Sequence, residues 1–520
     1  MKKNVIIVTM VAAFMLAAPL LCIDMSTSEG ADDKLWTDYC DYSWYDGTGS
    51  YEIDSAEKLA GVAYLVNVGI EWLGFALPAT TFQSETIALT KSVDLSAHLW
   101  DPIGFIDPDS DDAQEYQRFF RGAFIASPGV EITGLTIKNS EKLGIGLFGY
   151  IGEGSSVENV TLKDVDISGS VYAGGIAGVS YGGTIENCHV VSGTIDGEYF
   201  AGGIVSGLSN SYDSVHHVAY DGYVRNSSNK ADVSSAYFTG GIVGYMPEAE
   251  NEFSCWISAS YNFGDVVARG GDELDTAYAG GIIGNCVNGF VSKSYNAGSV
   301  SIEGPSGSAG GIAGFLQRMD DSSDINDTAI INSYNTGVIS GGNNAGGIIG
   351  DSDGSVIVIR CYNAGKITGL ENFGPIFGTE NAAVSNTYWL ADSTSARNGA
   401  RALADMTGAN AMDNMSGLDY PENPNPDAPV TQFVSTALDS YAPQLICFTE
   451  STSDVVKADS LASVDLTSAS PYNGDNVPTD DDDGSGNGDG DDDLLLYAGI
   501  AAVVAVVVVS VVYVVFIRKP

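Results

Sequence analysis

The chain has 520 residues with 22 Lys+Arg against 67 Asp+Glu, so its formal net charge is 22 − 67 = −45. Nucleic-acid binding needs clustered Lys and Arg, and because the sequence has no such cluster, we exclude nucleic acid as a partner. Gly makes up 63 residues, about 12% against a usual ~7%, while Pro is low at 16. This composition predicts many tight turns between short buried strands rather than a proline-rich disordered chain.

The first residues predict a secretory signal peptide. Lys2 and Lys3 precede an apolar run from Val5 to Leu21, the order of a charged n-region and an apolar h-region. We assign residues 1–25 to the signal, with cleavage expected between Cys22 and Ala31.

Residues 32–137 are interpreted as a small α/β cap that leads into the repeats. Asp54 followed by Glu57 fits a capping box that opens an amphipathic helix ending near Asn67. Such a helix would cover the first strands of a stack, whose unpaired edges would otherwise favour aggregation.

Residues 138–395 contain an internal repeat. Gly-Gly-Ile-x, closed by a further Gly, starts at Gly174, Gly202, Gly240, Gly280, Gly310 and Gly346, with degenerate copies at Ile145 and Gly374. The spacings are 29, 28, 38, 40, 30, 36 and 28 residues. A unit of this size indicates a solenoid, and the insertions after Gly202, Gly240 and Gly310 are candidate locations for a binding surface.

A second motif, Ser-Tyr-Asn-x-Gly, lies between the glycine motifs. It starts at Ser260, Ser294 and Ser333, and at Cys361 with Cys in the first place. Gly and Asn adopt positive φ at low cost, so their fixed places mark corners between strands. We predict an all-β fold, a parallel β-helix with an internal ladder formed by Ile176, Ile204, Ile242, Ile282, Ile312 and Ile348. A β-propeller and a β-sandwich are the alternatives, and the unit length and the doubled Gly disfavour both.

The two motifs together resemble the GLUG-motif repeat of bacterial and archaeal surface proteins, which include adhesin-like proteins and the non-catalytic part of some IgA-cleaving peptidases. The resemblance covers about residues 35 to 420. It implies a β-helical scaffold and a cell-surface location, and it implies no particular ligand. It also implies a last coil near Asn386–Trp389 and a short helical segment from Ala402 to Met415.

The chain after the repeats is divided by composition. Residues 396–448 are interpreted as a C-terminal capping segment, and 449–493 as an acidic Ser/Thr/Gly/Asp stalk that cannot bury enough apolar area to fold. Residues 494–517 are an unbroken apolar run of 24 residues, about 36 Å as a helix, and we predict a transmembrane helix. Arg518 and Lys519 follow it, so the tail 518–520 is expected in the cytoplasm and the rest outside the cell.

Candidate chemical sites are few. Polysaccharide-active β-helices use clustered carboxylates with a basic residue, but Arg225, Arg269, Arg318 and Arg360 have no carboxylate partners in sequence. We therefore predict no catalytic residue, no cofactor and no metal site. The acidic runs 107–112 and 320–327 are solvated loops or Ca²⁺ ligands, and neither matches an EF-hand. His216-His217 has no ligand partners at metal-binding spacing.

Other candidate modifications follow from the predicted external location. Candidate N-glycosylation sites are Asn159, Asn226, Asn326 and Asn414, each in an Asn-x-Ser/Thr sequon. Cys188 and Cys361 occupy the place of Ser in sister repeats, which predicts buried small residues. Disulfides are allowed outside the cell, but the sequence does not assign pairs.

We thus predict a single-pass cell-surface adhesin or recognition protein that presents a β-helical rod to cells, glycans or surface polymers. Its partner is an unidentified extracellular glycan, cell-surface molecule or protein. The alternatives are a structural component of the cell envelope or surface layer, and a polysaccharide-active β-helix enzyme.

Overall fold

The computed structural model describes the chain from Lys34 to Tyr472. Residues within this range that are not described are 73–74, 78, 107–116, 139–140, 214–216, 248–254, 271–275, 305, 319–327, 355, 380–381, 392–398, 419–431 and 450–453. The predicted signal peptide, transmembrane helix and cytoplasmic tail lie outside the described residues. Among the residues that are described, no helix is both long and apolar enough to cross a membrane.

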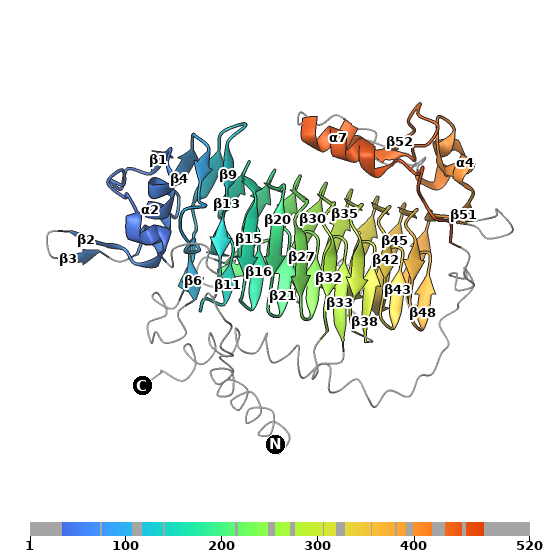
Figure 1. Ribbon diagram of the computed structural model, residues 1–520, viewed down its shortest axis with the longest axis horizontal. Coiled ribbons are helices and arrows are strands. Elements are labelled where there is room, and N and C mark those ends of the chain that lie inside the picture. The colour runs from blue at the N-terminus through green and yellow to red at the C-terminus, as the bar shows by residue number, and fades with distance from the viewer. Residues whose placement is uncertain are drawn as a thin grey trace, which may run out of the picture. The chain divides into compact units, whose positions relative to one another are not determined.

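Short strands stack into five parallel sheets that run along one axis (Figure 1). One coil shows the pattern: β13 (Ser156–Glu158), β14 (Thr161–Lys163), β15 (Val165–Ser168), β16 (Tyr172–Gly174) and β17 (Ala177–Tyr181) follow one another along the chain. Each then pairs in parallel with the corresponding strand of the next coil. The predicted parallel β-helix is therefore confirmed, with five strands in a full coil.

We number the sheets 1 to 5 in the order in which the chain visits them. Sheet 1 contains β1 (Ser50–Ile53), β4 (Thr86–Leu89), β8 (Ala123–Ala126), β13, β18 (Thr184–Glu186), β25 (Tyr223–Arg225), β30 (Cys255–Ser258), β35 (Gly289–Ser292), β40 (Ala329–Ile331), β45 (Val356–Ile359) and β49 (Ala382–Ser385). Sheet 2 contains β5 (Val93–Asp94), β9 (Glu131–Thr133), β14, β19 (His189–Val190), β26 (Ser228–Asn229), β31 (Tyr261–Asn262), β36 (Tyr295–Asn296), β41 (Tyr334–Asn335), β46 (Tyr362–Asn363), β50 (Tyr388–Leu390) and β51 (Ala400–Arg401).

The other three sheets are shorter. Sheet 3 contains β10 (Thr136–Ile137), β15, β20 (Gly193–Asp196), β27 (Asp232–Ser235), β32 (Val266–Ala268), β37 (Val300–Ile302), β42 (Ile339–Ser340) and β47 (Ile367–Thr368). Sheet 4 contains β11 (Gly144–Ile145), β16, β21 (Phe200–Gly202), β28 (Phe238–Gly240), β33 (Ala277–Gly280), β38 (Gly307–Gly310), β43 (Asn344–Gly346) and β48 (Asn372–Gly374). Sheet 5 contains β12 (Phe148–Ile151), β17, β22 (Val205–Ser209), β29 (Val243–Met246), β34 (Ile283–Val287), β39 (Ala313–Gln317) and β44 (Ile349–Asp353).

Four antiparallel pairs stand outside these sheets. They are β2 (Ile70–Trp72) with β3 (Phe75–Leu77), β6 (Phe105–Ile106) with β7 (Gln117–Arg118), β23 (Ser211–Asp213) with β24 (Val218–Tyr220), and β52 (Phe433–Val434) with β53 (Gln444–Leu445). Six strands of the lead-in, β1, β4, β5, β8, β9 and β10, already belong to the parallel sheets, so the stack begins well before residue 138.

The predicted isoleucine ladder is confirmed. The six isoleucines of the glycine motif are fully buried, and the backbone N–H of each donates to the carbonyl of its equivalent in the next coil at 2.9–3.0 Å, ending on Ile376. The ladder belongs to one continuous apolar core that runs from the cap through the repeats.

The two sequence motifs contact one another across the interior of the coil. Asn229, Asn262, Asn296, Asn335 and Asn363 form a second buried ladder, in which each side-chain amide donates to the side-chain carbonyl of the next Asn at 2.8–3.0 Å. The second Gly of every doubled pair from Gly202-Gly203 onward lies against this ladder, whereas Gly175 in the first pair lies against Val190. A Cβ at Gly281 would be 2.3 Å from Asn296 Cγ and 2.2 Å from the Gly311 carbonyl oxygen. Any residue larger than Gly would displace the ladder, which explains why the motifs recur together.

The corner between sheets 1 and 2 uses one residue with positive φ in each coil. These residues are Asn159, Asn187, Asn226, Ala259, Lys293, Asn332, Arg360 and Asn386, with φ between 47° and 61°. In four of these coils a Ser follows, and its hydroxyl accepts a backbone N–H from the coil before, as Ser294 does from Ser260 at 3.2 Å. Cys188 and Cys361 take this place in their coils and are fully buried, as predicted.

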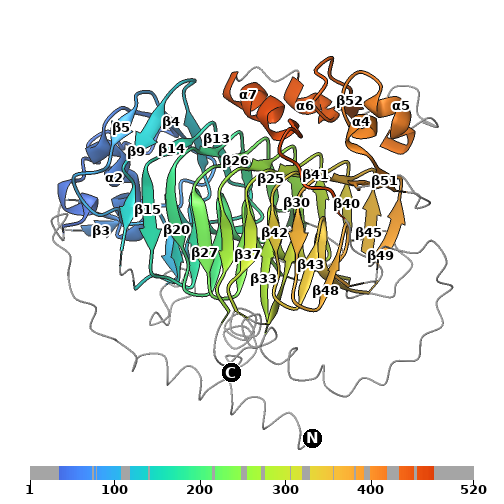
Figure 2. The same ribbon diagram turned by 45° about the vertical axis from the view of Figure 1, so that its right-hand side comes forward.

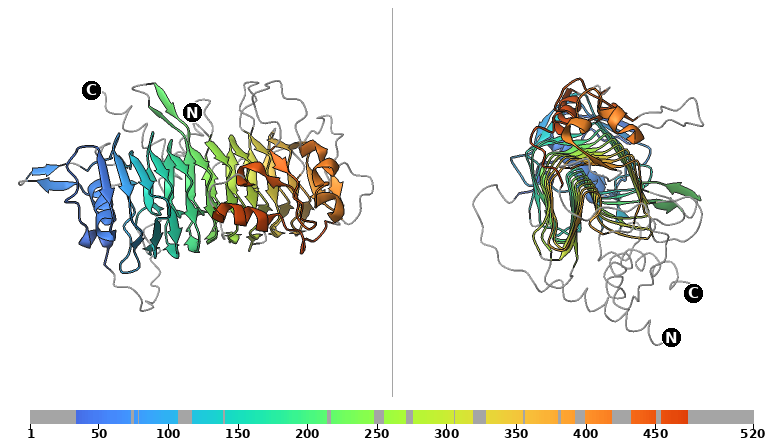
Figure 3. Two further views of the ribbon diagram at one scale, coloured as in Figure 1. Left: turned by 90° about the horizontal axis from the view of Figure 1, so that it is seen from above. Right: turned by 90° about the vertical axis from the view of Figure 1, so that its right-hand side faces the viewer.

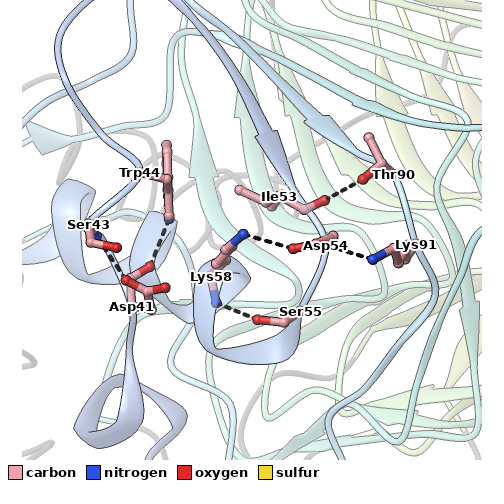
Figure 4. A network of polar contacts seen from close by, with 9 residues as sticks. All are labelled: Asp41, Ser43, Trp44, Ile53, Asp54, Ser55, Lys58, Thr90 and Lys91. Atoms are coloured by element: carbon pink, nitrogen blue, oxygen red, sulfur yellow. Dashed lines mark hydrogen bonds and ion pairs between the residues drawn. The ribbon is translucent and has the colours of Figure 1, made fainter.

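The cap is built around helix α2 (Ala56–Asn67), with the 3-10 helix η2 (Trp36–Tyr39) against it. The N-cap is Ser55, whose hydroxyl accepts the Lys58 backbone N–H at 3.3 Å, so the prediction of Asp54 as N-cap is wrong by one residue. Asp54 instead pairs with the ammonium groups of Lys58 and Lys91, both at 2.8 Å (Figure 4). Hydrogen bonds from these two groups lower the pKa of Asp54 to about 2.

The C-terminal segment begins with α4 (Leu403–Met406) and α5 (Ala411–Asn414), both within the helical region predicted from Ala402 to Met415, and η3 (Ser416–Leu418) follows just beyond that region. It continues through β52 and β53 into α6 (Ile446–Thr449) and α7 (Asp454–Ser463), which lie over sheet 2 (Figure 2). Sheet 2 places four tyrosine rings beneath it, Tyr261, Tyr295, Tyr334 and Tyr362, stacked at 4.7–5.0 Å.

The C-terminal segment is held by hydrogen bonds to these rings. The Tyr261 hydroxyl donates to Asp459 at 3.0 Å, the Tyr362 hydroxyl donates to the Pro443 carbonyl at 2.7 Å, and Tyr334 bonds to Ser463 at 2.9 Å. The structure differs here from the interpretation of residues 449–493 as stalk, because residues 454–472 are packed. The physical reason is the tyrosine row, which supplies an apolar surface that composition alone does not reveal.

Candidate ligand-binding face

Among the repeat residues that the structure describes, the most exposed aromatic side chain lies on the outer face of sheet 1. Strand alternation sends Val224, Ile257 and Val291 into the core, where each is at most 1% exposed. Their neighbours along each strand therefore face outward. The parallel register places Tyr223, Trp256 and Phe290 next to one another in successive coils. We call these three residues the aromatic strip.

The centre of the aromatic strip is a stacked ring pair. The rings of Trp256 and Phe290 lie 4.3 Å apart with an interplanar angle of 13°. Trp256 is 37% exposed, whereas Trp36, Trp100 and Trp389 are buried. An exposed indole on a rigid sheet is typical of an interaction site, because burying it on binding is favourable and the sheet holds it in place.

A polar row runs beside the aromatic strip. The outward residues two places further along the same strands are Arg225, Ser258 and Ser292, also paired in register. Arg225 forms an ion pair with Glu186 of the previous coil at 2.7 Å. Towards the C-terminal end this row becomes apolar, with Ile331 and Ile359.

Tyr223 is oriented by its neighbour Asp221. Its hydroxyl donates to the Asp221 carboxylate at 2.8 Å. Burial, and then this hydrogen bond, raise the pKa of Tyr223 to about 12, so the phenol stays protonated at any physiological pH. The strip is therefore uncharged.

The three insertions, after Gly202, Gly240 and Gly310, all lie at the corner between sheet 5 and sheet 1. Each follows a strand of sheet 5 (β22, β29 or β39) and precedes a strand of sheet 1 (β25, β30 or β40). The first contains the hairpin β23–β24, which stands out from the stack and is drawn in green in Figure 3. Tyr212 and Val218 of this hairpin are exposed, and the Tyr212 hydroxyl lies 3.1 Å from His217 Nδ1. Residues 248–254 and 319–327 of the other two insertions are outside the described residues.

Two of the four sequon asparagines have a structural role. Asn159 and Asn226 occupy the positive-φ corner between sheets 1 and 2. The Asn159 side chain accepts a hydrogen bond from Asn187 at 2.7 Å, and the Asn226 amide donates to Glu186 at 3.3 Å. Asn414 is exposed at the end of α5, and Asn326 is outside the described residues. Glycosylation of all four stays a prediction.

The structure pairs two of the candidate arginines with carboxylates far away in sequence. Besides Arg225 with Glu186, Arg269 lies 2.5 Å from Asp196 on sheet 3. Arg360 instead donates to Asn332 at 2.9 Å. Arg225 and Arg360 lie at the end of sheet 1, four coils apart, and Arg269 follows a strand of sheet 3, so these three residues do not gather into one cluster.

No group of three or more potential metal ligands occurs among the residues that the structure describes. His217 precedes β24 of the hairpin, while His216 and both acidic runs, 107–112 and 320–327, lie outside the described residues. The predicted absence of a metal site stays a prediction.

Six cysteines are present as free thiols in the described range, four of them buried. Burial raises the pKa of Cys188, Cys255 and Cys361 to about 12 each, which makes these thiols poor nucleophiles. They pack as small apolar residues.

Sequence reasoning missed the aromatic strip. The signal was present, since Cys255-Trp256-Ile257-Ser258 and Gly289-Phe290-Val291-Ser292 alternate around inward Ile257 and Val291. Alternation would have placed both aromatic rings outside, but only the register shows that they stack.

Comparisons with known proteins add little. No family model matches the sequence. No curated protein matches it. Among solved structures, the chain is similar to a protein of Bacteroides ovatus described as a "putative immunoglobulin A1 protease", with 14% identity over 74% of this chain and 93% of that chain, and a TM-score of 0.38. So distant a match carries no argument about function, and the fold assignment rests on the strand pairing itself.

Proposed function

We propose that the chain is a cell-surface recognition protein, a GLUG-like β-helical adhesin without catalytic activity, whose ligand lies on the outer face of sheet 1. The observation behind this proposal is Trp256, which is 37% exposed and stacked on the half-buried Phe290, on a rigid sheet at the side where three insertions enter. The predicted signal peptide and transmembrane helix support a location at the membrane with the repeats outside.

The rigidity of the scaffold favours binding over chemistry. The Asn and Ile ladders are fully hydrogen-bonded from coil to coil, so outward side chains keep their positions when a ligand approaches. A preorganised face loses less conformational entropy on binding. The acidic exterior keeps such a rod soluble and separated from its neighbours.

The test compares adhesion of cells that display the full-length chain with cells that display Trp256→Ala. We expect the variant to lose most adhesion to partner cells at equal surface amount, measured with an antibody. The matched control is Tyr42→Ala, because Tyr42 is 38% exposed and stacked on Tyr64 at 5.2 Å, yet lies on the cap. Equal adhesion by the Trp256 variant and the unchanged chain would contradict the proposed function.

A further inference from the structure

A largely buried lysine lies beside a buried side-chain amide where the cap meets the repeats. Lys142 lies between β10 and β11, and its side chain is 20% exposed. Asn67 is the last residue of α2 and is 6% exposed. We propose that Lys142 Nζ and the Asn67 side chain join in an intramolecular amide (isopeptide) bond once the chain has folded, with release of ammonia. Such a bond needs no ligand, so its absence would leave the proposed function untouched.

Asp101 bridges the two groups. One of its carboxylate oxygens, Oδ1, forms an ion pair with Lys142 Nζ, and the other, Oδ2, accepts a hydrogen bond from Asn67 Nδ2 at 3.2 Å. The Pro102 carbonyl oxygen is shared in the same way, since it accepts from Asn67 Nδ2 at 2.9 Å and from Lys142 Nζ at 3.4 Å. These two shared partners hold the lysine nitrogen next to the amide.

The Asn67 amide is oriented as an electrophile. Its Oδ1 accepts the Gly104 backbone N–H at 2.8 Å. A hydrogen-bond donor therefore already points at the oxygen on which negative charge develops when Cγ is attacked. Gly104 is tightly enclosed, because a Cβ there would lie 2.6 Å from the Arg118 carbonyl oxygen and 2.8 Å from the Tyr150 carbonyl oxygen. The donor is thus in position before the reaction begins.

The surroundings of Lys142 favour the uncharged amine. Only the uncharged form of a lysine amine attacks a carbonyl carbon. Burial lowers the pKa of Lys142, and the opposing effect of the Asp101 charge is smaller. Moving one proton from the ammonium to the carboxylate leaves two neutral groups, whose burial costs less than the burial of two charges. The ion pair is therefore a ready source of the nucleophile.

The reaction balances without any further reactant. Asp101 takes one proton from the Lys142 ammonium, and the Nζ lone pair attacks Asn67 Cγ. As the new C–N bond forms and the Cγ–Nδ2 bond breaks, Asp101 passes its proton to Nδ2 and accepts the second proton from Nζ. Ammonia leaves and takes this last proton as ammonium, which restores the carboxylate. Each residue reacts once, so the chain turns over no substrate.

The bond would join the cap covalently to the start of the repeats. It closes a long loop, from residue 67 to residue 142, and a covalent cross-link of distant residues stabilises the folded chain by restricting the unfolded one. It would also keep α2 in place at the end of the stack, where loss of the cap would expose strand edges.

The test is tryptic digestion of the purified full-length chain, in detergent, followed by mass spectrometry. Trypsin cuts after Lys and Arg, so Asn67 and Lys142 of an unlinked chain lie in separate peptides. We expect one branched peptide that joins residues 59–91 to residues 139–163, because an amide on Lys142 blocks cleavage there. Its mass should equal the sum of these two peptides less one ammonia.

Variants identify the groups that react. Lys142→Arg keeps the positive charge but removes the nucleophile, and Asp101→Ala removes the group that transfers the protons, so both should lose the branched peptide. The matched control is Lys138→Arg, because Lys138 also forms an ion pair, with Asp166 at 2.7 Å, but is 47% exposed. This control should keep the branched peptide in full, and circular dichroism checks that every variant is folded.

The other outcomes each overturn a defined part of the inference. Separate, unlinked peptides from the folded, unchanged chain would overturn it entirely. A branched peptide that joins residues 92–118 to residues 139–163, lighter by one water, would place the bond on Asp101 and overturn Asn67 as the partner. Full retention of the branched peptide in Asp101→Ala would overturn proton transfer by Asp101. The adhesion assay with Trp256→Ala tests the proposed function separately.

Discussion

Replacing Gly281 with Ala tests the contact between the two repeat motifs most directly. The added methyl would lie 2.2 Å from the Gly311 carbonyl oxygen and 2.3 Å from Asn296 Cγ, both well inside van der Waals contact. Neither neighbour can move without disturbing its ladder, because Asn296 bonds to Asn262, Asn335 and the Gly298 carbonyl at 2.8–3.0 Å. Overpacking of a tight core costs about 1–3 kcal/mol, and a buried hydrogen bond broken in the process adds about 1–3 kcal/mol. We therefore expect a loss of about 3 kcal/mol in the free energy of unfolding.

The matched control is Gly207→Ala, in a strand of sheet 5. A methyl there would lie 3.5 Å from the Val179 side chain, which is ordinary contact. Because Ala also restricts the unfolded chain, Gly207→Ala should be neutral or stabilising by up to about 1 kcal/mol. The assay is urea unfolding followed by far-ultraviolet circular dichroism. Equal stability of the two variants would refute the explanation of why the doubled Gly accompanies the Asn motif.

Three further predictions concern other parts of the stack. Burial lowers the pKa of His189 to about 4, below the value of about 6.5 in the unfolded chain. The free energy of unfolding is therefore highest above pH 6.5, and it falls by about 3 kcal/mol in all as the pH drops from 6.5 towards 4. His189→Gln should flatten this dependence in urea titrations at about pH 7 and pH 4. Asp459→Ala removes the ion pair to Lys230 at 2.8 Å and the acceptor of the Tyr261 hydroxyl. Limited proteolysis should therefore cut residues 449–472 faster in this variant than in the control Lys457→Ala, since Lys457 is an exposed residue of the same helix. Equal cleavage rates would show that the Asp459 contacts do not hold the segment. The described range has six free thiols, of which a thiol reagent should modify at most Cys40 and Cys447 in the native protein and all six in urea. Fewer than six modified thiols in urea would reveal a disulfide.

The repeats show how far sequence patterns reach in this protein. The spacing of the glycine motifs predicted a solenoid, and the isoleucine ladder has the predicted partners, because each coil repeats the same local choices of Gly, Asn and Ile. The cap prediction was less accurate: Ser55 and Asp54 are both good N-caps, and only the position of Lys91, far away in sequence, explains why Asp54 turns to an ion pair instead.

The site shows the opposite case. The spacing of the glycine motifs reveals the insertions, but only the structure shows that all three lie at the corner between sheets 5 and 1. Likewise, the pairing of Arg225 with Glu186 joins residues 39 positions apart, with an insertion between them. Contacts of this kind depend on the register between neighbouring coils. The sequence alone does not give that register, because the insertions differ in length.

The sequence by itself determined the local rules of the fold. Gly and Asn specify the corners, Val and Ile specify the inward face, and a short repeat can bury that face only by stacking on its copies. The tertiary structure decided which outward side chains meet. Trp256 and Phe290 become one surface only because adjacent coils pair in register, and residues 454–472 fold only because four tyrosines from successive coils form a surface for them. Inward positions are dictated by local alternation, whereas outward neighbours come from different coils and so depend on the whole stack.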